Sequence, residues 1–118
     1  MGKQPESRLQ KAAQDHLRAT VGGWWFKVWG GPFTPAGIPD LIGCVDGLFF
    51  ALEVKLPKKS SQPSPIQLET IREIVMKGGG VATIVRSKEE AEAVVIEALA
   101  RAASRLQVRC RTRRHRHV

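Results

Sequence analysis

The sequence predicts a small α/β domain in which a mixed β-sheet is flanked by helices in the order α-β-β-β-α-β-α. Asp46-Gly47 separates two apolar runs, which is the strongest short signal in the chain for a two-residue hairpin turn. Capping-box patterns at 64–67 and 87–90 open helices on either side of the apolar run 81–85. A strand between two helices joins its sheet through a parallel crossover, so the sheet is expected to be mixed. With 118 residues, the chain forms one domain with its own core.

The N-terminal part of the chain is expected to form a helix over about residues 6–19 and a strand over residues 24–29. The helix is predicted from an apolar stripe at helical spacing, formed by Leu9, Ala13, His16 and Leu17. The strand contains Trp24, Trp25 and Trp29. We expect these rings in the core or at an interface, although an exposed one could stack on an unpaired base.

The predicted hairpin fixes which side chains face one another. If Asp46-Gly47 forms the loop, counting back along both strands brings Asp40 directly opposite Glu53. Opposed residues share one face of a sheet, with Cβ atoms roughly 4.5–5.5 Å apart. Lys55 lies two residues beyond Glu53 and therefore on the same face. The register thus predicts two carboxylates and one ammonium together, and a slip of one residue would separate them.

The second half of the chain supplies the remaining elements. A helix with Pro65 at its first position is expected to end at the glycines 78–80. Its buried stripe is predicted to consist of Leu68, Ile71 and Val75. Residues 81–85 then form a short buried strand, and a last helix follows. The apolar face of that helix is predicted to consist of Ala91, Val94, Val95, Ala98 and Leu99.

The pairing of Asp40 with Glu53 has a chemical implication. Two like charges directly opposed on apolar strands destabilise the fold unless a cation compensates them, and Lys55 or a bound metal ion could do so. Carboxylate oxygens without nearby His or Cys suit Mg²⁺ or Mn²⁺ rather than zinc. Each fragment alone also has a structural explanation, as a strand-start cap for Asp40 and as a solvated strand edge for Glu53 with Lys55.

The string Pro39-Asp40, followed after twelve residues by Glu53-Val54-Lys55, resembles the motif of the PD-(D/E)xK nucleases, and its surroundings resemble the VRR-NUC branch. The match covers about residues 4–99. A bare motif of this kind is short and common, so the ordered flanking features carry the resemblance. They are Glu6 with Leu9-Gln10, the run 37–42, the Gly47 turn, Gln67 and the run 80–87.

The resemblance implies a restriction-endonuclease-like fold and hydrolysis of DNA phosphodiester bonds with Mg²⁺ or Mn²⁺. Small stand-alone members look like homodimers that cut branched DNA such as Holliday junctions. The implied catalytic residues are Asp40, Glu53, Lys55 and Gln67. The implied metal ligands are Asp40, Glu53, the carbonyl of Val54 and, directly or through water, Glu6.

Two of these residues also have local explanations. Gln67 stands at the third helical position after Ser64, where it completes a capping box. Glu6 stands in the first turn of the first helix, where the helix macrodipole favours a carboxylate. For Gln67 and for Glu6, the local structural role and the role in the site are therefore equally favoured.

Positive charge is concentrated at the C-terminal end. Residues 1–100 nearly balance, whereas residues 101–118 hold seven Arg and no acidic residue. We therefore expect a nuclease domain over 1–100 and a basic tail over 101–118, in which the last helix ends and disorder follows. The residues predicted to contact DNA phosphates are Lys58, Lys59, Arg109, Arg111, Arg113, Arg114 and Arg116. A solvated tail and loop without a role are the alternatives.

Composition further limits the cellular location and the possible functions of the protein. Cys44 and Cys110 form no disulfide framework, no apolar run approaches a membrane span, and no signal-peptide pattern precedes the first helix. We therefore expect no membrane partner and a cytoplasmic location in a bacterial or phage-infected cell. The chain contains no Tyr, which excludes a tyrosine nucleophile. The function remains open between a homodimeric endonuclease selective for branched DNA, a general or nicking nuclease, and a non-catalytic DNA-binding module.

Overall fold

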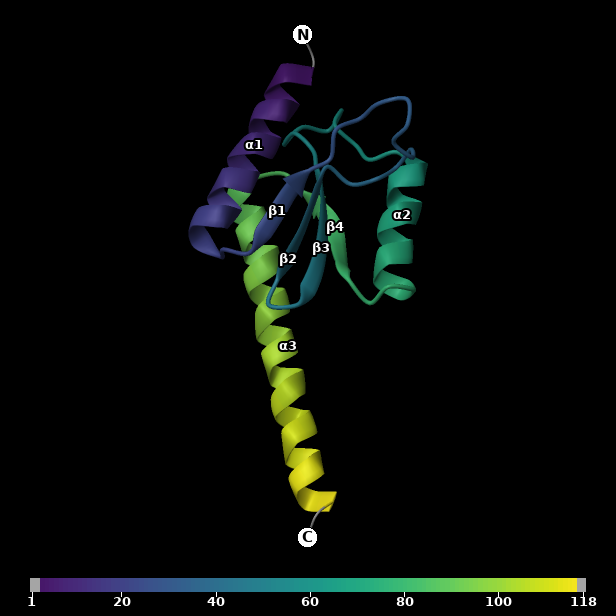
Figure 1. The fold of residues 1–118 in the computed structure, drawn as a ribbon. Helices are drawn as coiled ribbons and strands as arrows, with labels where there is room; N and C mark the ends of the chain where they lie inside the picture. Colours follow the sequence, from purple (N-terminus) through teal and green to yellow (C-terminus); the bar gives the residue numbers. More distant parts are fainter. Residues whose placement is uncertain (1–2, 117–118) are drawn as a thin grey trace.

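A mixed β-sheet lies at the centre of the computed structural model, which describes residues 3–116 and the side chains of residues 5–112. The elements follow the predicted order (Figure 1). They are α1 (Lys3–Thr20), β1 (Trp24–Lys27), β2 (Leu41–Val45), β3 (Leu48–Val54), α2 (Pro65–Met76), β4 (Val81–Val85) and α3 (Lys88–Arg116). Within residues 3–116, none of these helices combines the length and apolar character needed to cross a bilayer.

The strands lie in the order β1-β2-β3-β4. The pairs β1–β2 and β2–β3 are antiparallel, and β3–β4 is parallel because α2 crosses from the end of one strand to the start of the other. Helices α1 and α3 cover one face of the sheet and α2 lies against the other (Figure 1). The α/β class and the mixed sheet predicted from the sequence are confirmed.

The core lies between the sheet and the α1–α3 layer. Residues that the register places on this face of the sheet are buried, and both helices contribute small or aliphatic residues against them. This core consists of Trp25, Leu41, Val45, Phe50, Leu52, Val54 and Val85 from the strands, Ala13 and Leu17 from α1, and Ala91 and Val95 from α3. The apolar stripes predicted for the first and last helices are therefore the ones that pack.

Helix α2 differs from its prediction. None of its residues is fully buried, and Leu68 and Val75, which were predicted to face the core, are 48% and 42% exposed. The inward stripe runs instead through Gln67, Ile71 and Ile74, which are half-buried at helical spacing. The sequence could not separate these two stripes because α2 carries apolar residues on more than one side.

Helix α3 corrects the predicted disorder of the tail. It begins with the Ser87 cap, whose Oγ accepts the Glu90 N–H at 3.0 Å, and continues to Arg116. The sequence after Gly80 contains neither Gly nor Pro, and residues such as Ala, Leu and Arg favour helix even where like charges repel. The basic segment is therefore a helical extension beyond the sheet (Figure 1), and the longest dimension of the molecule is 65 Å.

The outer edge of β1 is closed by side chains of α1. The carbonyl of Trp25, which does not point toward β2, accepts bonds from Gln14 Nε2 at 3.2 Å and from Arg18 Nη2 at 3.1 Å. The indole N–H of Trp25 donates to the Gly22 carbonyl at 2.8 Å. These bonds fix the buried ring and satisfy a backbone acceptor at the edge of the sheet.

Replacing Gly43 by Ala is expected to destabilise the fold by about 2 kcal/mol, because overpacking a core typically costs about 1–3 kcal/mol. A Cβ at Gly43 would lie 2.2 Å from Cε3 of the Trp25 ring, which is itself buried. Urea denaturation measures the change. Gly30→Ala, where a Cβ meets nothing within 4 Å, is the matched control. Equal midpoints for both variants would contradict the packing described here.

Candidate functional site

The site is set by the turn between β2 and β3. Asp46 and Gly47 both have positive φ, 50° and 82°, as a type I′ turn requires. The two strands pair from Val45 with Leu48 through Leu41 with Leu52. The predicted register is confirmed, and one position beyond its last pair it brings Asp40 opposite Glu53, whose carboxyls interact.

Asp40 is held at the start of β2 by two backbone contacts. Its Oδ2 accepts the N–H of Val54 at 2.9 Å, and its own carbonyl accepts the N–H of Val28 at 2.8 Å. The first bond ties the carboxylate across the hairpin to the residue after Glu53. The side chain is half-buried, so one carboxylate oxygen is committed to the fold while the group still borders solvent.

Glu53 is fully buried in β3, with 0% exposure. Within the described side chains, neither of its carboxylate oxygens has a hydrogen-bond partner. Burial, reinforced by the neighbouring Asp40 carboxylate and partly opposed by the charge of Lys55, raises the pKa of Glu53 from 4.5 to about 9. A buried carboxyl without a donor is costly as an anion, so this group favours either a proton or a cation.

Lys55 follows β3 and completes the set. Its backbone N–H donates to the Val85 carbonyl at 3.0 Å, which fixes the chain against β4. Its side chain is half-buried, and its charge lowers the pKa of Glu53, so the ammonium lies within electrostatic range of that carboxyl. Asp40, Glu53 and Lys55 therefore lie together, as the register predicted.

The residues present fit a divalent cation. Glu53 presents two buried oxygens that no donor satisfies, and Asp40 adds a second hard-oxygen group beside them. Among residues 5–112, no third His, Cys, Asp or Glu joins them in a group that could hold an ion. Glu6 lies in the first turn of α1 and is not brought into such a group. Magnesium commonly uses only one or two protein carboxylates, so two are sufficient.

Solved structures similar to this chain are nuclease-type domains. One described as a "VRR_NUC domain" is 28% identical, covers 76% of this chain and 92% of its own, and superimposes with a TM-score of 0.59. Another, a "VRR_NUC domain protein", is 19% identical, covers 78% of this chain and 85% of its own, and has a TM-score of 0.62. The chain is similar to VRR-NUC domains. No family model and no curated protein matches the sequence.

In this VRR-NUC-like domain, Gln67 caps α2. Its Oε1 accepts the Ser64 N–H at 2.8 Å, and its N–H donates to Ser64 Oγ at 3.3 Å. The capping box predicted from the sequence is confirmed, and the side-chain oxygen of Gln67 is engaged there. A catalytic role for Gln67 stays a prediction.

Sequence reasoning missed the role of Arg86, which follows β4 and contacts the loop after Lys55. Lys58 and Lys59 are exposed there, and the Arg86 guanidinium donates to the carbonyls of Leu56 and Ser61. The sequence offered one signal for this role, because Arg86 directly follows the buried strand and lies in the run 80–87 that contributes to the family resemblance. Its partner atoms are backbone carbonyls distant in sequence, and no residue pattern identifies those.

The remaining predicted DNA contacts lie on α3. Arg109 and Arg111 are exposed, and Arg113, Arg114 and Arg116 lie outside the side chains that the structure describes.

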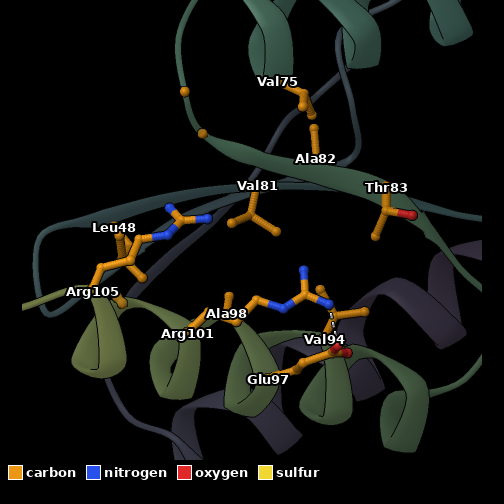
Figure 2. A pocket seen from close by; sticks show the side chains of 13 residues that line it. Leu48, Val75, Val81, Ala82, Thr83, Val94, Glu97, Ala98, Arg101 and Arg105 are labelled. Carbon is orange, nitrogen blue, oxygen red and sulfur yellow. Dashed lines mark hydrogen bonds and ion pairs between the residues drawn. The ribbon is translucent and has the colours of Figure 1, made fainter. Parts of the chain in front are cut away.

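A cavity of about 540 Å³ lies between α3 and β4, with Arg101 and Arg105 reaching across it toward the sheet (Figure 2). Its lining includes none of Asp40, Glu53 and Lys55. We therefore place the candidate site at the hairpin and not in this cavity.

The raised pKa of Glu53 predicts a stability that depends on pH. In the metal-free protein the folded state keeps its proton up to about pH 9, whereas the unfolded chain loses it near pH 4.5. The folded state binds more protons in this window, so this group lowers stability as pH rises through it. In EDTA, the wild type is expected to lose more stability than Glu53→Gln between about pH 5.5 and about pH 8.5.

Urea denaturation at both pH values measures this difference. Glu69→Gln, which changes an exposed carboxylate on α2, is the control and is expected to follow the wild type. Parallel pH profiles for the wild type and Glu53→Gln would show that Glu53 is not buried with a raised pKa.

Proposed function

We propose that this VRR-NUC-like domain is a divalent-metal-dependent DNA endonuclease acting on branched DNA such as Holliday junctions. The observation that carries the proposal is the pair Asp40 and Glu53, opposed across the hairpin with both Glu53 oxygens buried and without donors. Binding of DNA alone requires no such pair. DNA as the substrate also suits the expected cytoplasmic location in a bacterial or phage-infected cell.

The proposed chemistry divides between the residues of the hairpin. Asp40 and Glu53 would hold Mg²⁺ or Mn²⁺, with the carbonyl of Val54 as a further proposed ligand and Glu6 as a proposed contact through water. When bound, the cation supplies positive charge at the scissile phosphate. Lys55, on the same face, orients the attacking water and offsets the negative charge that develops on the phosphate. Hydrolysis is in-line and forms no covalent intermediate.

We also propose that DNA phosphates contact Lys58, Lys59, Arg109 and Arg111. All four side chains are exposed, and salt-sensitive affinity is expected from cations that displace counterions. The tail residues Arg113, Arg114 and Arg116 belong to the same proposal. Because this segment is helical through Arg116, it presents its arginines from a stiff element.

A homodimer is supported by an uncovered part of the sheet. On the face that carries the site, the pairing aligns Trp24 with Cys44 and Phe49, and Phe26 with Ile42. Trp24 is 59% exposed, and Phe26 and Phe49 are each 44% exposed. We call these five residues the bare apolar face. Large exposed apolar patches mark protein interfaces, and a second copy of the chain would pair two sites for two strands.

Metal-dependent cleavage tests the proposed function. With Mg²⁺ or Mn²⁺, the wild type is expected to cut a labelled four-way junction, and EDTA is expected to abolish cutting. Asp40→Asn and Lys55→Ala are each expected to lower the rate at least about 100-fold, because loss of one preorganised electrostatic group costs about 10²–10³. Asp15→Asn, which changes an exposed carboxylate on α1, is the control and is expected to retain activity.

A flap, a plain duplex and single-stranded DNA complete the substrate series. Equal cutting of all of them would replace the junction reading with a general or nicking nuclease. Tight binding without metal-dependent product from the wild type would leave only the DNA-binding module.

The bare apolar face predicts the oligomeric state. Sedimentation velocity is expected to show a dimer for the wild type and a monomer for the double variant Trp24→Lys/Phe26→Lys, because charges there oppose burial against a second copy. Trp29→Lys, at a tryptophan that is 70% exposed and lies outside β1, is the control. A monomeric wild type, or a double variant that dimerises equally, contradicts this assignment.

A further inference from the structure

The loop that follows Lys55 is held in place by one arginine. The Arg86 guanidinium donates to the Leu56 carbonyl at 2.7 Å and the Ser61 carbonyl at 2.8 Å, with a longer bond of 3.4 Å to Oε1 of Gln62. Leu56 and Ser61 lie within the loop between β3 and α2, on either side of the segment that carries Lys58 and Lys59, and Arg86 directly follows β4. Because the guanidinium is a planar fork with fixed donors, it sets both sides of this segment relative to the sheet.

The loop is further ordered by its own polar groups. Ser61 Oγ accepts the Leu56 N–H at 3.0 Å, and the Ser61 N–H donates to the Lys58 carbonyl at 3.0 Å. The side-chain amide of Gln62 donates to the Lys59 carbonyl at 3.0 Å. Gln62 therefore links the guanidinium of Arg86 to the backbone at the second lysine, and the backbone that carries both lysines is fixed before any ligand arrives.

The charges of this loop are not compensated. An open cavity of about 350 Å³ is lined by Pro57, Lys58, Lys59, Gln62 and Arg86. Among the described side chains, the ion pairs involve other residues, so the three cations of the cavity have no carboxylate partner. The nearby Glu90 carboxylate accepts the backbone N–H of Arg86, at 3.4 Å, and not its guanidinium. The cavity therefore attracts an anion.

The position of this cavity selects the kind of anion. Lys58 stands three residues beyond Lys55, so their Cα atoms are at most about 11 Å apart. The phosphates of one strand of duplex DNA are spaced about 3.4 Å apart along the helix axis. We propose that Lys58 and Lys59 bind a backbone phosphate within a few nucleotides of the bond that is cut, and that Arg86 is the positioning residue for this contact. The inference rests on the proposed nuclease function.

DNA binding in EDTA tests the two lysines without cleavage. The probe is a labelled four-way junction, titrated with the full chain at several salt concentrations. The double variant Lys58→Gln/Lys59→Gln is expected to bind roughly tenfold more weakly, with a salt slope lower by about one to two. Lys77→Gln, an exposed lysine just after α2, is the matched control for binding.

The role of Arg86 is tested by comparing variants of the residue and of the loop. Arg86→Gln and Arg86→Lys are both expected to weaken binding, because Nη1 donates to both carbonyls while Nη2 donates to Gln62, and a lysine has neither a second nitrogen nor a planar group to hold this arrangement. The triple variant with all three changes to Gln is expected to bind no more weakly than the double lysine variant, since both act through one contact. Thermal denaturation identifies the fraction of each variant that is folded.

Three results would overturn the proposal. Wild-type binding by the double lysine variant would remove the phosphate contact. Additive losses in the triple variant, or full recovery with Arg86→Lys, would remove the positioning role of Arg86. If the wild type binds and cuts DNA while these results are obtained, the nuclease function stands and only this inference fails. A wild type that neither binds nor cuts DNA would end both.

Discussion

Burial of Glu53 beside Asp40 is the constraint on which the rest of the structure depends. A carboxyl with 0% exposure and no donor opposes folding, so the packing around it must compensate for its cost. The strands supply that packing on the opposite face, where Leu41, Leu52 and Val54 are fully buried. The tight turn at Asp46 then leaves only one register in which these residues face the core. Apolar burial on one face of the sheet thus stabilises the fold, and the buried carboxyl on the other face destabilises it.

The two faces of the sheet consequently have different roles. The face under α1 and α3 carries the hydrophobic core, whereas the face that carries Glu53 is only partly covered by α2. The loop held by Arg86 lies near the two carboxylates because it follows Lys55. The bare apolar face lies on their other side because the strand pairing aligns it with the same face of the sheet. Positive charge, the two carboxylates and apolar surface are therefore neighbours, and the proposed substrate and the proposed second chain would meet the same region of the molecule.

The sequence predicted the parts of this arrangement that depend on local geometry. The turn at Asp46-Gly47 determined the strand register, and Ser64 with Gln67 determined the start of α2, because each rests on residues close together in the chain. The parts that depend on distant partners were not accessible. The apolar residues of α2 did not reveal which side of the helix meets the sheet. For the tail, we predicted disorder from the repulsion between its arginines, although the sequence contains no residue that would end α3 there. The carbonyls that bind Arg86 carry no sequence signal.

The side chains that close the outer edge of β1 have a consequence for how copies of this protein associate. Unsatisfied carbonyls at the edge of a sheet are templates on which a strand from another chain can add, and repeated addition leads to fibrils. At the Trp25 carbonyl that position is already filled by Gln14 and Arg18. At this position β1 therefore opposes the addition of a further strand, and contacts of this edge with other copies are directed to its exposed aromatic side chains, where association can stop at a closed assembly.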